Sequence, residues 1–261
     1  MLRSIKNLIG YPIHATDGDF GKVVDCLFDD KEWGLRYLVV HTHGLLNRHD
    51  VLISPRDLDQ PEVGWFDRHV PVKLTKQEIE DSPSVDMQKP VSQLYEEEYS
   101  RYHQHHVYWE GSMIWGSTIF PNLKADDRSK GLDALHEARM KWIGDRTLRS
   151  AKEVIGYAVT ASDGDIGVVA DLILQTDQWR VRHLVVDTNK WLPGGKVLID
   201  VDWTEEVEWA RKDIVVNQTK ETIRQAPTYY AHDPVNRDYE QDLYDYYGEP
   251  RYWEEKFPPV M

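Results

Sequence analysis

The sequence has little cysteine and no long apolar run. Cys26 is the only cysteine among 261 residues, so no disulfide can form within the chain. No stretch approaches the roughly 20 apolar residues that a membrane-spanning helix needs, and residues 1–10 lack the apolar core of a signal peptide. We therefore expect a cytoplasmic protein with no integral membrane segment, for which peripheral membrane contact stays open.

Positive charge is also scarce. The chain has 45 acidic and 31 basic residues, which gives a formal net charge of -14 and an isoelectric point of about 5.2. Affinity for nucleic acids rests largely on cationic side chains that neutralise phosphates, and no cluster of Lys and Arg stands out in this sequence. We therefore expect no nucleic-acid partner.

What the sequence does contain is a duplication. The pattern Asp17-Gly18-Asp19-x-Gly21 recurs as Asp163-Gly164-Asp165-x-Gly167, at an offset of 146. Matches at the same offset begin at Arg3 and Arg149, and matches at an offset of 144 extend to Tyr108-Trp109-Glu110 and Tyr252-Trp253-Glu254. The chain therefore holds two copies of one module, each followed by an aromatic tail.

Each copy has the pattern of a small β-structure. The glycines at the matched turns, Gly18, Gly21, Gly164 and Gly167, tolerate positive φ and indicate hairpin turns. Apolar stretches in the first copy predict strands at residues 13–15, 21–28, 34–42, 50–54, 63–65 and 70–74. About six short strands per copy favour a small barrel or a sandwich.

Helices are expected at three kinds of place. Thr75 and Glu78 have the spacing of a capping box, whereas Thr219 and Thr222 lack the acidic partner. The tails at 92–110 and 236–254 suit either a short amphipathic helix or an extended arm. Residues 111–131 read as a linker, and the spacing of apolar residues predicts a helix over 132–143 that ends at Gly144.

These patterns divide the chain into four segments. The first barrel-like module is expected at 1–82, and an aromatic tail with linker and short helix at 83–148. The second module is expected at 149–226, and an aromatic C-terminal tail at 227–261.

The pattern of the first copy resembles the PRC-barrel family. Ile9-Gly10 precedes Asp17-Gly18-x-x-Gly21-x-Val23-x-Asp25, and then come Trp33, Arg36-Tyr37-Leu38-Val39-Val40 and Val51-Leu52-Ile53-Ser54-Pro55. The same string recurs between Ile155 and Asp200. The resemblance covers about residues 3–80 and 149–224, and it is more specific for fold than for function.

The resemblance implies a mainly β fold, with two tandem six-stranded PRC-type barrels, short helices and aromatic-rich tails. The family's barrel also occurs in the photosynthetic reaction-centre H subunit and in the ribosome maturation factor RimM. The resemblance also implies a bacterial, non-catalytic module that binds a protein partner or a second copy of itself. One alternative is an accessory protein of a membrane complex, similar to the H subunit.

The second alternative is a metal-binding protein. His103 and His106 are spaced for one helical face, and imidazole is a common ligand of transition metals. The matching positions of the second copy, Tyr247 and Pro250, do not repeat the pair. A solvated, pH-sensitive patch is the other interpretation.

Other polar residues have structural interpretations beside their chemical ones. The turn aspartates lack the ligand spacing of an EF-hand loop. Asp25 and Arg36 recur as Asp171 and Arg182, so each carboxylate and guanidinium could pair in the interior or face solvent. No catalytic residue and no cofactor are predicted.

The aromatic tails carry the main functional hypothesis. Matched aromatic residues lie at Tyr95, Tyr108, Trp109, Tyr239, Tyr252 and Trp253. Tyrosine and tryptophan are enriched at protein interfaces, so these residues could bind a partner. Alternatively, each tail packs on a module of its own chain.

Overall fold

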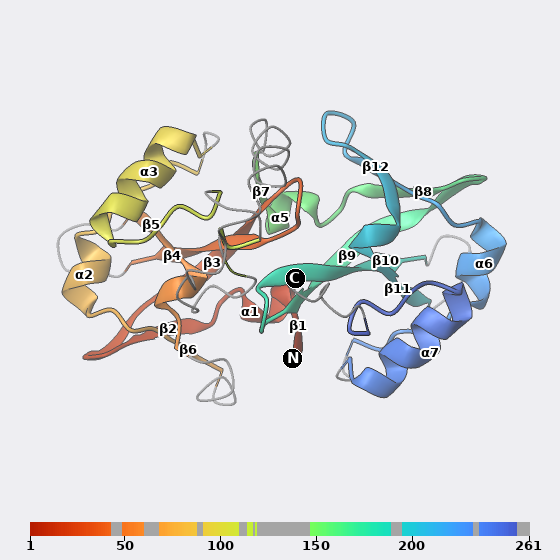
Figure 1. The fold of residues 1–261 in the computed structure, drawn as a ribbon, viewed down its shortest axis with the longest axis horizontal. Coiled ribbons are helices and arrows are strands. Elements are labelled where there is room, and N and C mark those ends of the chain that lie inside the picture. Colours follow the sequence, from red (N-terminus) through yellow and green to blue (C-terminus); the bar gives the residue numbers. More distant parts are fainter. Residues whose placement is uncertain are drawn as a thin grey trace, which may run out of the picture. The chain divides into compact units, whose positions relative to one another are not determined.

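The computed structural model describes most of the chain. The described ranges are 1–42, 49–59, 68–87, 91–109, 114–116, 118, 147–188, 195–231 and 235–254. The strand predicted at 63–65 and the helix predicted at 132–143 lie outside them. The described residues are mainly β and form two sheets (Figure 1), as predicted, and by contacts the chain separates into two compact units.

Unit 1 contains residue 1, residues 3–153 and residues 174–181. Its strands are β2 (Pro12–Ala15), β3 (Gly18–Asp29), β4 (Leu35–His41), β5 (Asp50–Ile53) and β6 (Val70–Pro71). They pair in the order β5-β4-β3-β2-β6. The pairing between Leu58 and Val72 links the chain that follows β5 to the chain that follows β6, which brings the two ends of this path together.

Unit 2 contains residue 2, residues 154–173 and residues 182–261. The strands of its sheet are β8 (Ala158–Ala161), β9 (Gly164–Gln175), β10 (Arg180–Asp187), β11 (Lys196–Asp200), β12 (Thr204–Glu208) and β13 (Asp213–Val216). They pair in the order β11-β10-β9-β8-β13-β12, and β1 (Leu2–Ser4) pairs with β9. The short 3-10 helix η4 (Val201–Trp203) joins β11 to β12 directly.

At two of the predicted turn positions, a neighbouring backbone lies so close that only glycine fits. Gly21 has a φ of +79°, and a Cβ atom there would lie 2.5 Å from the carbonyl oxygen of His41. Gly167 has a φ of +148°, and a Cβ atom there would lie 2.0 Å from the carbonyl oxygen of Asp187. Glycine lets the long strand of each copy bend close against its neighbour. Gly18 and Gly164 also have positive φ, at the first residue of β3 and of β9.

The beginning of the second sequence copy packs in unit 1. The strand β7 (Leu148–Ser150), where the matches of the second copy begin, pairs antiparallel with β3, with Leu27 opposite Ser150. The Asp25 carboxylate accepts hydrogen bonds from Ser150 Oγ at 2.5 Å and from the amide of Lys152 at 3.2 Å. The helix α5 (Ala151–Val154) begins directly after β7.

A turn of the second copy also belongs to unit 1. The amide of Leu35 donates to the carbonyl of Trp179 at 2.7 Å, and the amide of Val181 donates to the carbonyl of Trp33 at 2.8 Å. Trp33 and Trp179 match in the duplication, and both have positive φ, at 58° and 54°. The packing units therefore do not coincide with the sequence copies.

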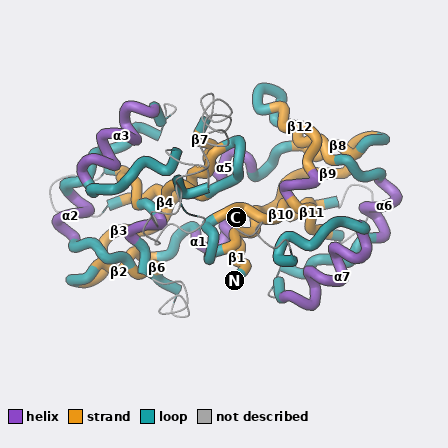
Figure 2. The backbone as a smooth tube through the Cα atoms, viewed as in Figure 1, coloured by secondary structure: helices purple, strands orange, loops and turns teal. Residues whose placement is uncertain are grey.

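Figure 2 shows the helices in purple, and the structure describes further α-helices beside α5. They are α1 (Ile5–Leu8), α2 (Lys76–Glu80), α3 (Gln93–Tyr102), α6 (Lys220–Gln225) and α7 (Arg237–Tyr247). Thr75 and Glu78 form the predicted capping box at α2, whereas Thr219 and Thr222 at α6 share a hydroxyl contact of 2.8 Å. Both tails are helical over their first part, α3 and α7, which decides between helix and extended arm.

The sheet of unit 1 is buried on both faces, because the tail covers one of them. Successive side chains of a strand point to opposite faces, and Tyr37 and Val39 of β4 form a cluster with Leu52 and with Tyr99 of α3. Leu38, between them, is also fully buried. Burial of a side chain of this size stabilises the fold by about 1.5–3 kcal/mol, so the tail is part of the unit's core.

Candidate docking site: the tail helices and their polar centres

Helix α3 carries a buried carboxylate to the sheet of unit 1. Glu96 is 3% exposed, and its carboxylate accepts hydrogen bonds from Tyr37 Oη at 3.2 Å and from Tyr108 Oη at 2.8 Å. Burial and the negative charge of Glu96 raise the pKa of Tyr37 well above its ordinary value, so this phenol stays a donor. A buried carboxylate needs such partners, because unpaired burial is very costly.

Arg36 packs against the ring of Tyr108. The Arg36 guanidinium lies 4.0 Å from the centre of the Tyr108 ring. It also pairs with Asp29 at 2.7 Å and with Glu32 at 3.0 Å. Burial alone would lower the pKa of Arg36, but the negative charge of Asp29 raises it above the ordinary value. We call Arg36, Tyr37, Glu96 and Tyr108 the polar centre of unit 1.

Unit 2 has the same arrangement. Glu240 of α7 is 1% exposed and accepts a hydrogen bond from Tyr252 Oη at 2.8 Å, while His183 Nε2 lies 3.2 Å from it. The Arg182 guanidinium lies 3.8 Å from the centre of the Tyr252 ring. Each of these four residues matches one residue of the first centre in the duplication, with His183 in place of Tyr37. We call Arg182, His183, Glu240 and Tyr252 the polar centre of unit 2.

The six aromatic residues that the sequence predicts for an interface pack within their own units. Tyr108 and Trp109 are each 5% exposed. Tyr95 Oη donates to the carbonyl of Pro83 at 2.6 Å, and Tyr239 Oη donates to the carbonyl of Pro227 at 3.0 Å. Tyr252 contributes to the second polar centre.

Trp253, the last of the six, also packs inside its unit. Its ring lies 5.0 Å from that of Tyr244 and 4.2 Å from the Arg237 guanidinium. Packing of the tails on their own chain, which we kept as the alternative to partner binding, is therefore what these residues do in the structure.

The predicted histidine pair does not lie on one helical face. Helix α3 ends at Tyr102, His103 caps it, and Gln104 has a φ of 55°, so the chain turns away before His106. His103 Nε2 lies 3.0 Å from Ser82 Oγ, and His105 pairs with Asp57 at 2.9 Å. Burial lowers the pKa of His103.

The search for further metal ligands is limited to the residues that the structure describes. Within the described ranges, no group of three or more His, Cys, Asp or Glu side chains is arranged to hold a metal ion. Asp17 of the first turn instead accepts a hydrogen bond from the amide of Lys76 at 2.9 Å, and Asp163 does the same for Lys220 at 2.7 Å.

The pairing that we considered for Asp25 and Arg36 is wrong. Arg36 pairs with Asp29, and Asp25 binds the segment around Ser150. Asp29 carried no signal in the duplication, because Gln175 occupies the matching position. Glu96 and Glu240 did carry one, since a carboxylate recurs among matched aromatic residues, but the sequence alone does not show that they are buried.

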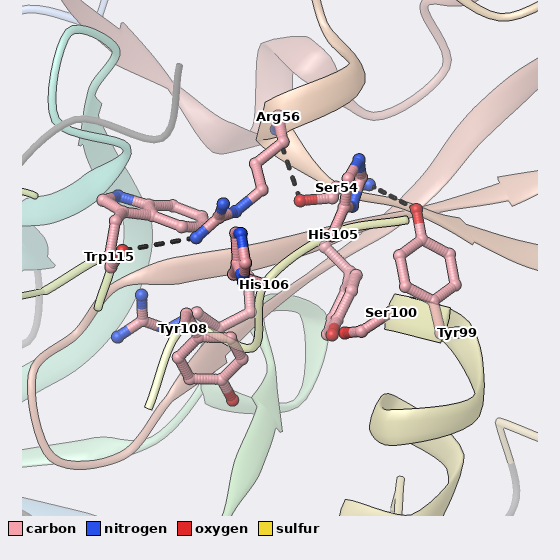
Figure 3. Close-up of a pocket in the computed structure, with 10 residues that line it drawn as sticks. Ser54, Arg56, Tyr99, Ser100, His105, His106, Tyr108 and Trp115 are labelled. Carbon is pink, nitrogen blue, oxygen red and sulfur yellow. Dashed lines mark hydrogen bonds between the residues drawn. The ribbon is translucent and has the colours of Figure 1, made fainter. Parts of the chain in front are cut away.

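A small pocket lies beside the polar centre of unit 1 (Figure 3). It is lined by residues that include Arg56, Ser100, His106 and Trp115, and its volume of about 10 Å³ admits about one water molecule. Sites for drug-sized ligands measure about 300–1,000 Å³, so this pocket is far smaller than such a site.

The comparison with protein families identifies the fold of the second copy. Residues 147–223 match the model of the PRC-barrel domain. The chain therefore contains a PRC-barrel domain, and the predicted resemblance is confirmed for this range. The match extends from β7 into α6 and leaves the tail helix α7 outside. The search of curated proteins gave no match.

The first copy repeats the strands of the PRC-barrel domain. The path β5-β4-β3-β2 in unit 1 corresponds strand by strand to β11-β10-β9-β8 in unit 2, and β3 and β9 have the same length at the offset of 146. Among the helices that the structure describes, none is long and apolar enough to cross a membrane.

Proposed function

We propose that this PRC-barrel protein is a non-catalytic docking protein that binds a protein partner or a second copy of itself through its tail helices. The observation that carries the proposal is a matched pair of exposed tyrosines. Tyr102 ends α3 and is 42% exposed, and Tyr246, at the offset of 144, lies in the last turn of α7 and is 37% exposed. Exposed tyrosines are typical anchors of protein interfaces.

The inner and outer faces of the tail helices differ. Tyr99 and Tyr244 are 1% and 2% exposed and pack inside their units, whereas Tyr102 and Tyr246 lie at the surface. Leu94, on the first turn of α3, adds an apolar side chain that is 73% exposed. The tail is held by its inner face, and the Tyr246 hydroxyl also donates to the carbonyl of Thr222 at 2.6 Å. The exposed parts of the Tyr102 and Tyr246 rings suit a partner.

Residues of catalytic type support a non-catalytic role, because they serve the fold. His183 contacts Glu240, His105 pairs with Asp57, and Asp25 binds Ser150. A nucleophile would need a base held within hydrogen-bond reach and space for a substrate beside both. The pocket of unit 1 admits about one water molecule.

Site-specific photo-cross-linking of the full chain tests the proposal. A photoreactive residue is placed at position 102, at position 246, or at the control position Gln93, which is exposed on the opposite side of the same helix, two and a half turns before Tyr102. We expect positions 102 and 246 to cross-link to the same defined species, either one partner protein or a second copy. Cross-links equal to the Gln93 control at both positions, together with a monomeric sedimentation profile, would contradict the proposal.

A further inference from the structure

Arg56 has an unusual position for a cation in a folded unit. It lies in the 3-10 helix η1 (Pro55–Asp57), directly after β5, and is half-buried. Its Nη2 donates to the carbonyl of Trp115 at 3.2 Å, and its guanidinium lies 5.8 Å from the centre of the Trp115 ring. Within the described part of the chain, no carboxylate forms an ion pair with Arg56.

A second arginine lies close to it. The Arg36 guanidinium is 5.0 Å from the centre of the same Trp115 ring. Burial first, and then the positive charge of Arg36, lower the pKa of Arg56. The charge of Arg36 is compensated by Asp29 and Glu32. The negative charge that acts on Arg56 is that of Asp57, which pairs with His105 and forms no ion pair with Arg56.

The second copy has an acidic residue at the position that matches Arg56. At the offset of 146, Arg56 corresponds to Asp202, whose carboxylate pairs with Arg182 at 3.1 Å. The nearby His105 and His106 correspond, at the offset of 144, to Glu249 and Pro250. The position that matches Arg56 therefore holds a carboxylate in the second copy, whereas in the first copy this position and positions 105 and 106 hold cationic or neutral donors.

The pocket of unit 1 brings these donors together. Figure 3 shows Arg56 and His106 extending into one space beside Trp115, and both line the pocket together with the Ser100 side chain. His106 is exposed, so this side of the pocket opens to solvent. The volume of about 10 Å³ admits one oxygen atom, while the remainder of a ligand stays outside.

We propose that this pocket binds the carboxylate group of a ligand. The planar guanidinium fork of Arg56 donates to the carboxylate oxygen that enters the pocket, and His106 donates to the other oxygen at the mouth. Trp115 holds the guanidinium in place. The ligand is either a small carboxylic acid or a peptide with an acidic side chain or a free C-terminus. The proposal is independent of the docking role of Tyr102 and Tyr246, and each can fail without the other.

Nuclear magnetic resonance on the full chain tests this site. The signals of the Arg56 Nε–H group and of the His106 ring are followed while succinate, the peptide acetyl-Asp-Asp, or inorganic phosphate is added at constant ionic strength. Succinamide serves as the uncharged control. We expect saturable shifts with succinate or the peptide and none with succinamide. The compound that binds more tightly, succinate or the peptide, shows whether the ligand is a small acid or a peptide.

Two variants of equal charge make the test specific. Arg56→Gln is expected to weaken carboxylate binding at least about tenfold, as the loss of one hydrogen bond to a charged group should. Arg101→Gln removes the same charge from an exposed position of α3 and is expected to leave binding unchanged. Arg56→Lys keeps the charge without the fork, and it is expected to bind less tightly than the original protein.

Three results would overturn the proposal. One is an equal shift with succinamide, and another is equal weakening by Arg56→Gln and Arg101→Gln, which would indicate a diffuse electrostatic effect. The third is tighter binding of phosphate than of both carboxylates. Amide spectra that match those of the original protein show that each variant is folded. If Arg56→Gln does not fold, the binding of Arg56→Lys is compared with that of Arg101→Gln instead.

Discussion

The two polar centres fulfil one structural task with different side chains. In unit 1, Arg36 is neutralised by the buried Asp29 and by Glu32, whereas in unit 2 Arg182 pairs with Asp202, whose side chain is 51% exposed. The buried glutamate is bound by a tyrosine of β4 in one unit and by a histidine of β10 in the other. What both units share is a glutamate of the tail helix and a later tail tyrosine that covers the arginine.

This difference teaches that the docked tail is the retained feature, and that its ionic partners can be exchanged. A buried ion pair is weak support for stability, yet breaking one is costly because a charge stays behind unpaired. The two units should therefore respond differently to the same substitution. Measuring the loss of stability in each unit tests this difference.

The largest expected difference concerns the two arginines. Arg36→Met leaves Asp29, which is 1% exposed, without its cation, and should lower the free energy of unfolding by about 3–5 kcal/mol. Arg182→Met leaves a half-exposed carboxylate and should cost about 1 kcal/mol. Urea unfolding monitored by hydrogen exchange in each unit measures both. Equal costs would show that the burial of Asp29 does not matter.

The turn glycines should give the next largest effect. Gly21→Ala places a Cβ atom 2.5 Å from the carbonyl oxygen of His41 in a backbone of positive φ, and should destabilise unit 1 by about 2–4 kcal/mol. Gly10→Ala is the matched control, because its φ is +95° but no atom lies within 4 Å of the added Cβ. Its cost should be about 1–2 kcal/mol. Thermal unfolding measures the loss of stability of both variants. The difference between the two losses is the cost of the close contact beyond that of the backbone strain.

A smaller effect is expected at the two short helices α2 and α6. Thr75→Ala removes the hydroxyl of a complete capping box, whereas Thr219→Ala removes a cap without an acidic partner. The first should cost about 1 kcal/mol, and the second less. Chemical unfolding of the two variants checks the order, which a larger loss for Thr219→Ala would contradict.

The smallest effect is a pH dependence confined to unit 1. Burial lowers the pKa of His103 in the folded chain below its ordinary value of 6.5. The unfolded chain then binds the proton more readily, so this stability is complete above pH 6.5 and is lost as the pH falls. His103→Tyr, which installs the matched residue of the second copy, should reduce the difference between urea midpoints at pH 7.5 and 5.5. An unchanged difference would assign the dependence to other groups.

Much of the scaffold could be predicted from the sequence, because its signals are local. The turn glycines, the strands between them and the capping box at Thr75 each depend on residues near one another in the chain. The duplication doubled these signals, so the corresponding elements of the second copy followed at once. The resemblance to the PRC-barrel family rests on the same turns and strands.

The candidate site was harder to predict, because its contacts join distant residues. Arg36 pairs with Asp29, seven residues earlier, across a turn in which Trp33 has positive φ, and nothing in the duplication marks it. The pairing of Asp25 with Ser150 spans 125 residues. His103 and His106 were placed on one face only by assuming that α3 continues, and Gln104 ends that regularity.

The central claim is that each tail is held on its own unit by the tyrosine of its polar centre. Hydrogen exchange of the full chain, compared between Tyr108→Leu and Tyr252→Leu, tests it most directly. We predict that Tyr108→Leu accelerates the exchange of the α3 amides at least about tenfold, through loss of a buried hydrogen bond to a charged group, and leaves α7 unchanged. Tyr252→Leu should do the reverse. Unchanged exchange in the helix of the altered unit would contradict the claim.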